Sequence, residues 1–218
     1  MRVGDLDAVF FDFDGVILES VDVKTRAFRQ IYEQRAPHIA DEVERFHLEN
    51  GGMSRFDKFR HWEEQLLARP LTAEGLEALC EQFSALVFEG VCSSPFVQGA
   101  DGLLERLRGR VPLHVVSATP HDEIGRNVDQ IGLSETFESV NGSPTTKTEW
   151  LRTLLERGAL DPERTLMVGD ASADHSAAVE NDVPFVGRCH RGEPAPFSPD
   201  ECVAVVDDLD TLSLLISD

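Results

Sequence analysis

Short apolar runs of strand length recur along the chain and alternate with segments of helical spacing. Residues 6–13 read LDAVFFDF, a nearly continuous apolar run that is typical of a central strand covered on both faces. Two later runs are followed by stretches with helical spacing, at 122–131 and 172–181. This alternation predicts an α/β fold, a Rossmann-like parallel sheet with right-handed crossovers. The other strand candidates are 111–118, 165–169 and 183–187, with weaker ones at 136–140 and 202–206, and a closing helix is expected at 210–216.

A different pattern fills the chain between the first predicted strand and the second. From residue 22 to about 89 there is no strand pattern, and apolar residues recur at helical spacing. Helix breakers divide this region into about four helices, and they are Pro37, Gly51, Gly52 and Pro70. The sequence therefore predicts an inserted all-α subdomain over residues 19–93, with residues 1–18 and 94–218 forming the core domain.

The composition is strongly acidic. Against 20 lysines and arginines stand 40 aspartates and glutamates, so the formal net charge is −20. Nucleic acids and anionic membranes bind basic surfaces, so we expect neither as a partner. An anionic small molecule is compatible with this charge, because a pocket can be locally positive, above all if it holds a metal ion. The basic residues include only three lysines, Lys24, Lys58 and Lys147.

The cysteines and the apolar stretches bear on location. The four cysteines contain no Cys-x-x-Cys pair, which disfavours a zinc ribbon or a thioredoxin-type site, and we expect them to be small buried hydrophobes. We find no signal-peptide pattern and no run of about 18 apolar residues. We therefore expect a cytoplasmic protein, either a monomer or a homodimer. The cysteines are Cys80, Cys92, Cys189 and Cys202.

The most informative segment is the end of the first predicted strand. Asp12 and Asp14 end this apolar run, where residues two apart point to one side, and Gly15 permits a sharp turn. The crevice at the carboxyl ends of parallel strands is where open α/β sheets bind ligands. Two carboxylates there repel each other unless a cation neutralises them or one holds a proton. The same Asp-x-Asp spacing elsewhere in the chain lacks this context, and we interpret it as solvated.

Three further segments place polar groups at the same predicted edge. Ser117, followed by Ala118, ends the strand candidate 111–118, and Lys147 lies at the mouth of a predicted helix. Asp170 follows the strand that ends at Gly169. Asp174 lies one helical turn later on the same face. Each residue alone has an ordinary structural explanation, such as a helix cap or a surface charge, but their order predicts a phosphoryl-transfer pocket.

The chain resembles the haloacid dehalogenase (HAD) superfamily of aspartate-nucleophile phosphohydrolases, in the branch of phosphoglycolate phosphatases and β-phosphoglucomutases. The matching motifs are the Asp12–Val16 segment, Ser117, Lys147, and Gly169-Asp170 with Asp174. The resemblance covers essentially the whole chain. It implies a Rossmann-like core whose first strand is central and a mobile helical cap inserted after the first motif.

The resemblance also implies roles. Asp12 is expected to be the nucleophile, and Asp14 the general acid and base, for which a raised pKa is expected. Mg²⁺ is expected on the Asp12 and Asp170 side chains and the Asp14 backbone carbonyl. Lys147 and Ser117 are expected to clamp phosphate oxygens. The supporting residues are Gly15, Gly169 and Asp174.

The insert is expected to select the substrate, a small polar phosphomonoester such as a sugar phosphate or hydroxy-acid phosphate. Lys24, Ser54 and Arg55 are the candidate contacts to it, together with Ser117, Ala118 and Lys147, while Lys58 is expected on the surface. A surface ion pair for Arg55 and a simple helix break at Gly51-Gly52 stay open as alternatives.

Other activities fit the motifs less well. Asp14 argues against dehalogenases and phosphonate hydrolases, which lack this second acid in the family, although Lys24 lies where a cap lysine could act. The phosphomutase branch carries a Gly-x-Ser-Arg segment that matches residues 52–55, but its fourth motif reads Glu-Asp rather than Gly169-Asp170. We therefore predict a phosphatase, with a sugar phosphomutase or a catalytically silent HAD-fold binding protein as alternatives.

Overall fold

The computed structural model describes residues 2–189 and 194–217. Six strands in the described residues form one parallel sheet, in the order β3-β2-β1-β4-β5-β6. This confirms the predicted α/β class with the first strand central. The strands are β1 (Ala8–Phe11), β2 (Leu113–Pro120), β3 (Ser139–Ser143), β4 (Thr165–Gly169), β5 (Phe185–Arg188) and β6 (Ala204–Val206).

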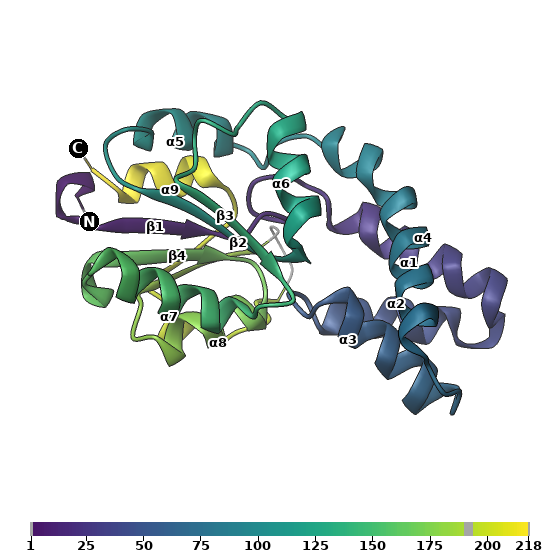
Figure 1. Cartoon of the computed structure of the whole chain (residues 1–218). Coiled ribbons are helices and arrows are strands. Elements are labelled where there is room, and N and C mark those ends of the chain that lie inside the picture. Colours follow the sequence, from purple (N-terminus) through teal and green to yellow (C-terminus); the bar gives the residue numbers. More distant parts are fainter. Residues whose placement is uncertain (1, 190–193, 218) are drawn as a thin grey trace.

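Helices cover both faces of the sheet, with α5, α6 and α9 on one side and α7 and α8 on the other (Figure 1). Strand β1 contributes Val9 and Phe11 to the first apolar core and Ala8 and Phe10 to the second, and all four side chains are fully buried. Burial on both faces explains why this run does not alternate with polar residues. These helices are α5 (Ala100–Leu107), α6 (His121–Gln130), α7 (Lys147–Gly158), α8 (Ser172–Glu180) and α9 (Leu209–Leu215).

One of the two weaker strand predictions is displaced in the structure. The candidate at 136–140 corresponds to β3 at Ser139–Ser143, which contains Asn141 and Gly142 rather than a run of apolar residues. The Asn141 side-chain amide donates to the Val115 carbonyl oxygen at 3.0 Å. A hydrogen bond to the neighbouring strand therefore stabilises a segment that the apolar pattern does not mark.

Helices α1 to α4 form a separate helical insert, which lies beyond the carboxyl edge of the sheet (Figure 1). Their interior is aromatic, with the Phe28 ring stacked on Phe83 at 4.0 Å between centroids and packed edgewise against Trp62 at 5.0 Å. These rings carry the helical periodicity seen in the sequence. The insert comprises α1 (Val21–Arg35), α2 (Ala40–Glu49), α3 (Arg55–Arg60), a π-helical segment (His61–Leu66) and α4 (Ala73–Cys92).

Two chain segments connect the insert to the sheet, and they run side by side. Leu18 and Phe96 form an antiparallel bridge, and Val97 N donates to the Ile17 carbonyl oxygen at 3.0 Å. Both connections therefore enter the insert next to the site end of β1.

Two other expectations concern the cysteines and the membrane. The four cysteine thiols are free and only half-buried, so the expectation of buried cysteines is wrong. Cys80, Cys189 and Cys202 pack at the edges of the apolar clusters. None of the helices in the described ranges has the length and apolar character needed to cross a membrane.

Candidate active site

Asp12 is the first residue after β1, and contacts hold both its backbone and its side chain. Its N–H donates to the Val168 carbonyl oxygen at 2.9 Å, and its Oδ1 accepts from the Phe13 N–H at 2.7 Å. Its Oδ2 lies 2.8 Å from Lys147 Nζ. The carboxylate is therefore buried and oriented at the carboxyl edge of the central strand.

Two glycines allow acidic side chains to approach this strand end. Gly15 has φ +76°, and a Cβ atom at this position would overlap the Asp170 carboxylate. A Cβ on Gly169 would overlap the side chain of Asp174. Both positions therefore require glycine: Gly15 for its left-handed backbone as well as for space, and Gly169 for space alone.

Lys147 begins α7 and lies between two carboxylates. Its Nζ is 2.8 Å from Asp12 Oδ2 and 2.5 Å from Asp174 Oδ1. Burial alone would lower the pKa of Lys147, but the charges of these two aspartates raise it above its ordinary value. Thr146 and Glu149 close a capping box at the start of α7, which fixes the residue that follows the cap. The ammonium is therefore held charged beside Asp12.

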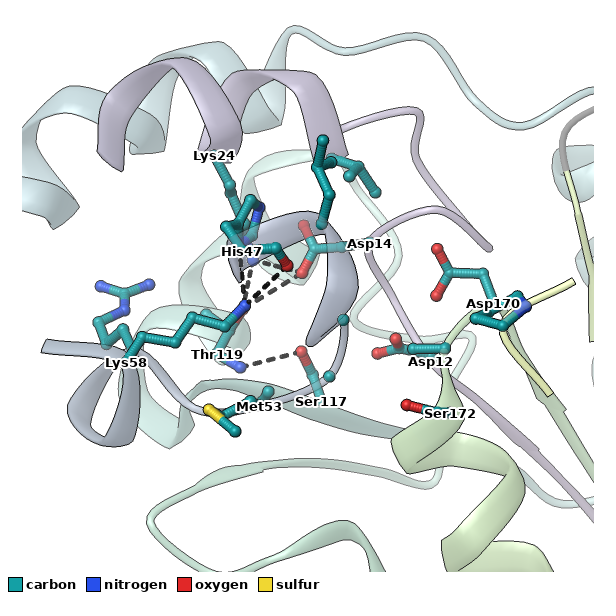
Figure 2. A pocket seen from close by; sticks show the side chains of 18 of the residues that line it. Asp12, Asp14, Lys24, His47, Met53, Lys58, Ser117, Thr119, Asp170 and Ser172 are labelled. Carbon is teal, nitrogen blue, oxygen red and sulfur yellow. Dashed lines mark hydrogen bonds and ion pairs between the residues drawn. The ribbon is translucent and has the colours of Figure 1, made fainter. Parts of the chain in front are cut away.

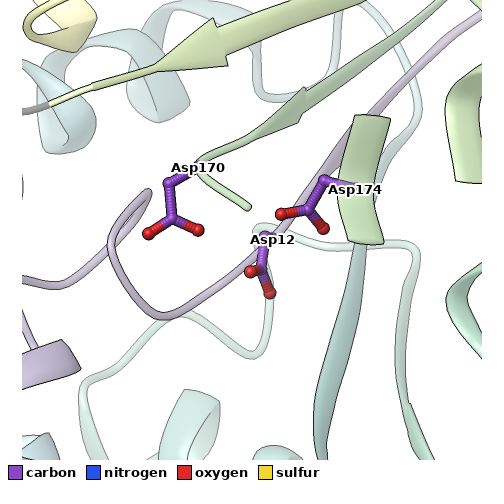
Figure 3. Close-up of side chains that lie close together, drawn as sticks. All are labelled: Asp12, Asp170 and Asp174. Atoms are coloured by element: carbon purple, nitrogen blue, oxygen red, sulfur yellow. The ribbon is translucent and has the colours of Figure 1, made fainter. Parts of the chain in front are cut away.

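The carboxylates of Asp12, Asp170 and Asp174 converge, with one oxygen of each within 4.8 Å of the others (Figure 3). Burial, together with repulsion from neighbouring aspartates, raises the pKa of Asp12 to about 7 and that of Asp170 well above its ordinary value. A cation would relieve this repulsion, and oxygen donors of this kind suit Mg²⁺. These residues fit a magnesium site. The side chain of Asp174 belongs to this group in the structure, although it was expected only as a support.

Asp14 has different neighbours from those expected. Its carboxylate accepts from Ser20 Oγ at 2.6 Å and from Thr119 Oγ1 at 3.3 Å, and it pairs with the Lys24 ammonium. Burial acts to raise its pKa, but Lys24 and Ser20 outweigh burial and lower the pKa below the ordinary value. The expectation of a raised pKa is therefore wrong for this structure, because the nearest groups are a cation and hydroxyls rather than another carboxylate.

Strand β2 contributes hydroxyl groups to the same edge. Ser117 is buried, and its Oγ accepts from the Thr119 N–H at 3.1 Å. Thr119 Oγ1 in turn accepts from Lys24 Nζ at 2.8 Å. Thr119 was not among the predicted residues, although its position two residues after Ser117 places it on the same side of the strand. The carbonyl oxygen of Ala118 accepts from Ser143 Oγ at 2.9 Å.

A cavity of about 500 Å³ lies between this sheet edge and the helical insert (Figure 2). Asp12, Asp14 and Asp170 line it from the core. The aromatic rings of Phe28 and Phe83 line it from the insert. Its size suits a small ligand that reaches from the carboxylates to the insert. The other predicted residues that line it are Lys24, Arg55, Ser117 and Ala118.

Arg55 and Ser54 make contacts within the fold. Arg55 is buried, and its Nη1 and Nη2 lie 2.9 and 2.5 Å from the Glu123 carboxylate on α6. Its Nη1 also donates to Ser84 Oγ at 2.7 Å. Ser54 caps α3 by accepting from the Asp57 N–H, and it is not among the residues that line the cavity. The ion pair that was left open as an alternative for Arg55 is therefore present, but it is buried and joins the insert to the core rather than lying on the surface.

Lys58 is not on the surface, contrary to the sequence prediction. Its side chain lines the cavity and is 2 % exposed. Its Nζ lies 2.7 Å from His47 Nδ1, on α2. Trp62 lies one helical turn after Lys58 and is buried. A large apolar residue at this spacing is the sequence signal that marks this face of the helix as buried. His47, which also lines the cavity, was not predicted to belong to the site.

Sequence comparison identifies the family. The family model of haloacid dehalogenase-like hydrolases matches residues 9–188. The chain belongs to this family. The predicted enzyme class, an HAD-family phosphatase, agrees with this match and with a curated relative. That relative, the phosphoglycolate phosphatase of Pseudomonas putida, is 26 % identical over 225 residues, covering 94 % of this chain and 77 % of its own.

Solved structures share the HAD fold. A predicted phosphoglycolate phosphatase of Haemophilus somnus superposes with a TM-score of 0.74 at 19 % identity, over 97 % of this chain and 98 % of the other. An HAD-family protein of Bacillus subtilis bound to magnesium gives 0.72 at 18 % identity, over 100 % of both chains. At these identities the comparisons establish the architecture, and the site must be argued from its own residues.

Proposed function

We propose that this HAD-family phosphatase is magnesium-dependent and hydrolyses a small phosphomonoester, a sugar phosphate or hydroxy-acid phosphate, through a phosphorylated Asp12. The observation that carries the proposal is the placement of Asp12. Its carboxylate is oriented by Lys147 and the Phe13 N–H, and it lines a cavity of about 500 Å³. A bound phosphate ester is thereby held near a fixed oxygen nucleophile.

In the first step, an Asp12 carboxylate oxygen attacks phosphorus and the ester P–O bond breaks. The leaving alkoxide takes a proton, for which Asp14 is the candidate donor. In the second step, a water molecule attacks phosphorus, Asp14 accepts the proton of that water, and the Asp12–phosphate bond breaks to restore the carboxylate. Lys24 and Ser20 lower the pKa of Asp14, so its acid role requires proton uptake once Lys24 moves away from it or the ester binds.

Mg²⁺, when bound, supplies positive charge that offsets the phosphate oxygens and the carboxylates. The side chains that would hold it are Asp12 and Asp170, with the Asp14 carbonyl oxygen. Asp174 would position Lys147, whose Nζ it contacts at 2.5 Å. Ser117 and Lys147 would bind phosphate oxygens. The insert, residues 19–93, would act as a cap that excludes water.

The segment that suggests a phosphomutase has structural roles of its own. Within the segment that suggests a phosphomutase, Ser54 caps a helix and Arg55 pairs with Glu123. The resemblance of this segment to the mutase motif therefore has a structural explanation.

The free thiols fit a reducing compartment, which supports the proposed cytoplasmic location.

The test is phosphate release from a broad panel of phosphomonoesters, with and without Mg²⁺. We expect release only with the metal, and loss of release in Asp12→Asn but not in Asp122→Asn, a matched change at an exposed aspartate of α6. Acid quenching with a ³²P-labelled ester should leave label on the wild type and on Asp122→Asn, and none on Asp12→Asn. Activity that survives Asp12→Asn, or no activity on any ester, would refute the proposal.

A further inference from the structure

The feature that the proposed reaction does not use is a buried pair of basic side chains on the insert side of the cavity. Lys58, on α3, directs its Nζ at His47 Nδ1 on α2 at 2.7 Å and lies 3.5 Å from the His47 carbonyl oxygen. The ammonium also lies 5.8 Å from the centre of the Phe28 ring. In Figure 2 the pair lies across the cavity from Asp12 and Asp170. These side chains therefore face the end of a ligand that is remote from the nucleophile.

The other cations among the described lining residues have carboxylate partners. Lys24 pairs with Asp14, and Arg55 pairs with Glu123. Arg188 pairs with Glu19 at 2.6 Å. Lys58 differs, because no carboxylate among the described residues accepts from it. Among the described residues that line the cavity, Lys58 is therefore the cation whose charge remains available to a ligand.

His47 adds a second unused donor. An ammonium can only donate, so His47 Nδ1 accepts from Lys58 and the neutral ring carries its proton on Nε2. His47 Nε2 is buried and has no partner in the described part of the chain. Burial, with the charge of Lys58, lowers the pKa of His47 to about 2, which keeps the ring neutral. The pair thus presents an unpaired charge and an unpaired N–H.

Such an arrangement is unfavourable unless an anionic group pairs with it. A buried ammonium without a counterion is destabilised by several kcal/mol, and a buried donor without an acceptor adds to this. Burial accordingly lowers the pKa of Lys58 to about 7. A ligand that brings a negative group into contact removes both costs. The cavity is therefore built for a ligand that is anionic at both ends.

We infer that Lys58 and His47 form a receptor for a carboxylate on the substrate, so that the preferred substrates are phosphorylated hydroxy acids rather than neutral sugar phosphates. This inference rests on the proposed phosphatase function and names its substrate class. A carboxylate matches the site better than a second phosphate, because one cation and one neutral donor offset a single charge. The Phe28 and Phe83 rings beside them favour a ligand of low charge density.

The first experiment compares esters that differ only in this group. Phosphoglycolate is set against its neutral amide, and 3-phosphoglycerate against glycerol 3-phosphate, with p-nitrophenyl phosphate as a general reporter. In at least one pair, kcat/KM should be about tenfold or more higher for the acid, the effect of one charge-assisted hydrogen bond. Equal values in both pairs, or a preference for the neutral esters, would overturn the inference.

The second experiment uses variants. Lys58→Met removes the charge with little change in size; it should raise KM for the acid about tenfold or more and change the neutral ester less than about threefold. Arg60→Met is the matched control, because it removes an exposed charge from the same helix. Lys58→Gln serves if Lys58→Met fails to fold. An equal loss for acid and neutral esters would contradict a carboxylate receptor.

A binding readout separates the inference from the proposed function. The chain has three lysines, so the ε-¹³C signals of lysine-labelled protein can be assigned by the loss of one signal in Lys58→Met. Phosphoglycolate should shift the Lys58 signal, and its amide should not. A wild-type protein that releases no phosphate but shows this shift refutes the phosphatase and retains the receptor. A protein that releases phosphate without any shift does the reverse.

Discussion

The buried ion pair between Arg55 and Glu123 gives a quantitative prediction about how the insert is held to the core. Arg55 belongs to α3 of the insert and Glu123 to α6 of the core. Their side chains are only 3 % and 4 % exposed, and two N···O distances of 2.5 and 2.9 Å join them. Ser84 Oγ adds a third contact to the carboxylate at 2.5 Å. Water therefore screens this pair little.

Arg55→Met leaves the Glu123 carboxylate buried without its counterion. Removing one partner of a buried pair costs about 3–5 kcal/mol, whereas replacing both partners with apolar side chains is often neutral or stabilising. For a chain of this size the single change should lower Tm by about 6–20 °C. The double variant Arg55→Met/Glu123→Met should recover most of this loss.

Urea unfolding of the wild type, both single variants and the double variant closes a double-mutant cycle. Arg60→Met, on the exposed face of α3, is the control and should stay within about 0.5 kcal/mol of the wild type. Limited proteolysis should also cleave Arg55→Met faster if the insert opens to hydrate Glu123. If Arg55→Met and the double variant are equally stable, Glu123 does not depend on Arg55 and the reasoning fails.

The same pair has a pH signature. Burial acts to raise the pKa of Glu123, but the hydrogen bonds and charge of Arg55 lower it below its ordinary value of 4.5. A carboxyl group whose pKa is lower in the folded state stabilises the protein above the unfolded pKa. The coupling free energy of the cycle should therefore be complete at pH 7 and decline as the pH falls below about 4.5.

Three further changes test other parts of the structure. Burial lowers the pKa of Lys58 to about 7. Between about pH 7 and 10.4, the unfolded chain therefore holds a proton on Lys58 that the folded chain lacks. This difference should make the free energy of unfolding rise with pH by up to about 1.4 kcal/mol per pH unit. Lys58→Met should abolish that slope, measured by urea unfolding at a series of pH values. Gly15→Ala puts a methyl group onto the Asp170 carboxylate, and activity should fall with a weaker apparent affinity for Mg²⁺, measured by metal titration. Tyr32→Phe removes a 3.0 Å hydrogen bond to the buried Glu63 carboxylate, which should cost about 1–3 kcal/mol by urea unfolding; no change would show that Arg35 alone satisfies Glu63.

The fold could be predicted from sequence wherever burial sets a local pattern. β1 is apolar at every position because both of its faces are covered, and β4 was predicted with its observed bounds for the same reason. β3 was displaced because Asn141 and Gly142 carry no apolar pattern, and the Asn141 side chain is held by a carbonyl of the neighbouring strand. That contact joins residues far apart in the chain, so no local pattern reveals it.

The candidate site divides in the same way. Asp12, Lys147 and Asp170 each lie at a strand end or a helix start, so the topology alone brings them to one edge. The predicted direction of the Asp14 pKa shift and the predicted surface position of Lys58 were wrong, because each property depends on a partner from another element. Lys24 pairs with Asp14 across ten residues of the chain, and His47 contacts Lys58 across eleven. The electrostatic environment of a site residue is therefore harder to predict from sequence than its position in the fold.

The net charge of −20 opposes the approach of a phosphate ester, and the charges around the cavity explain how such an ester could still bind. In salt at physiological strength, exposed charges are screened beyond about 8 Å, so the acidic coat acts weakly on a bound ester. Beside the sheet edge, Lys24 and Lys147 are already paired with aspartates. Under the proposed function, a phosphate group would therefore gain its main compensation from Mg²⁺ held by the carboxylates, whereas a carboxylate at the other end would gain it from Lys58. The two ends of the substrate then depend on different charges, and removal of the metal should weaken binding of the phosphate end while the contact to Lys58 persists.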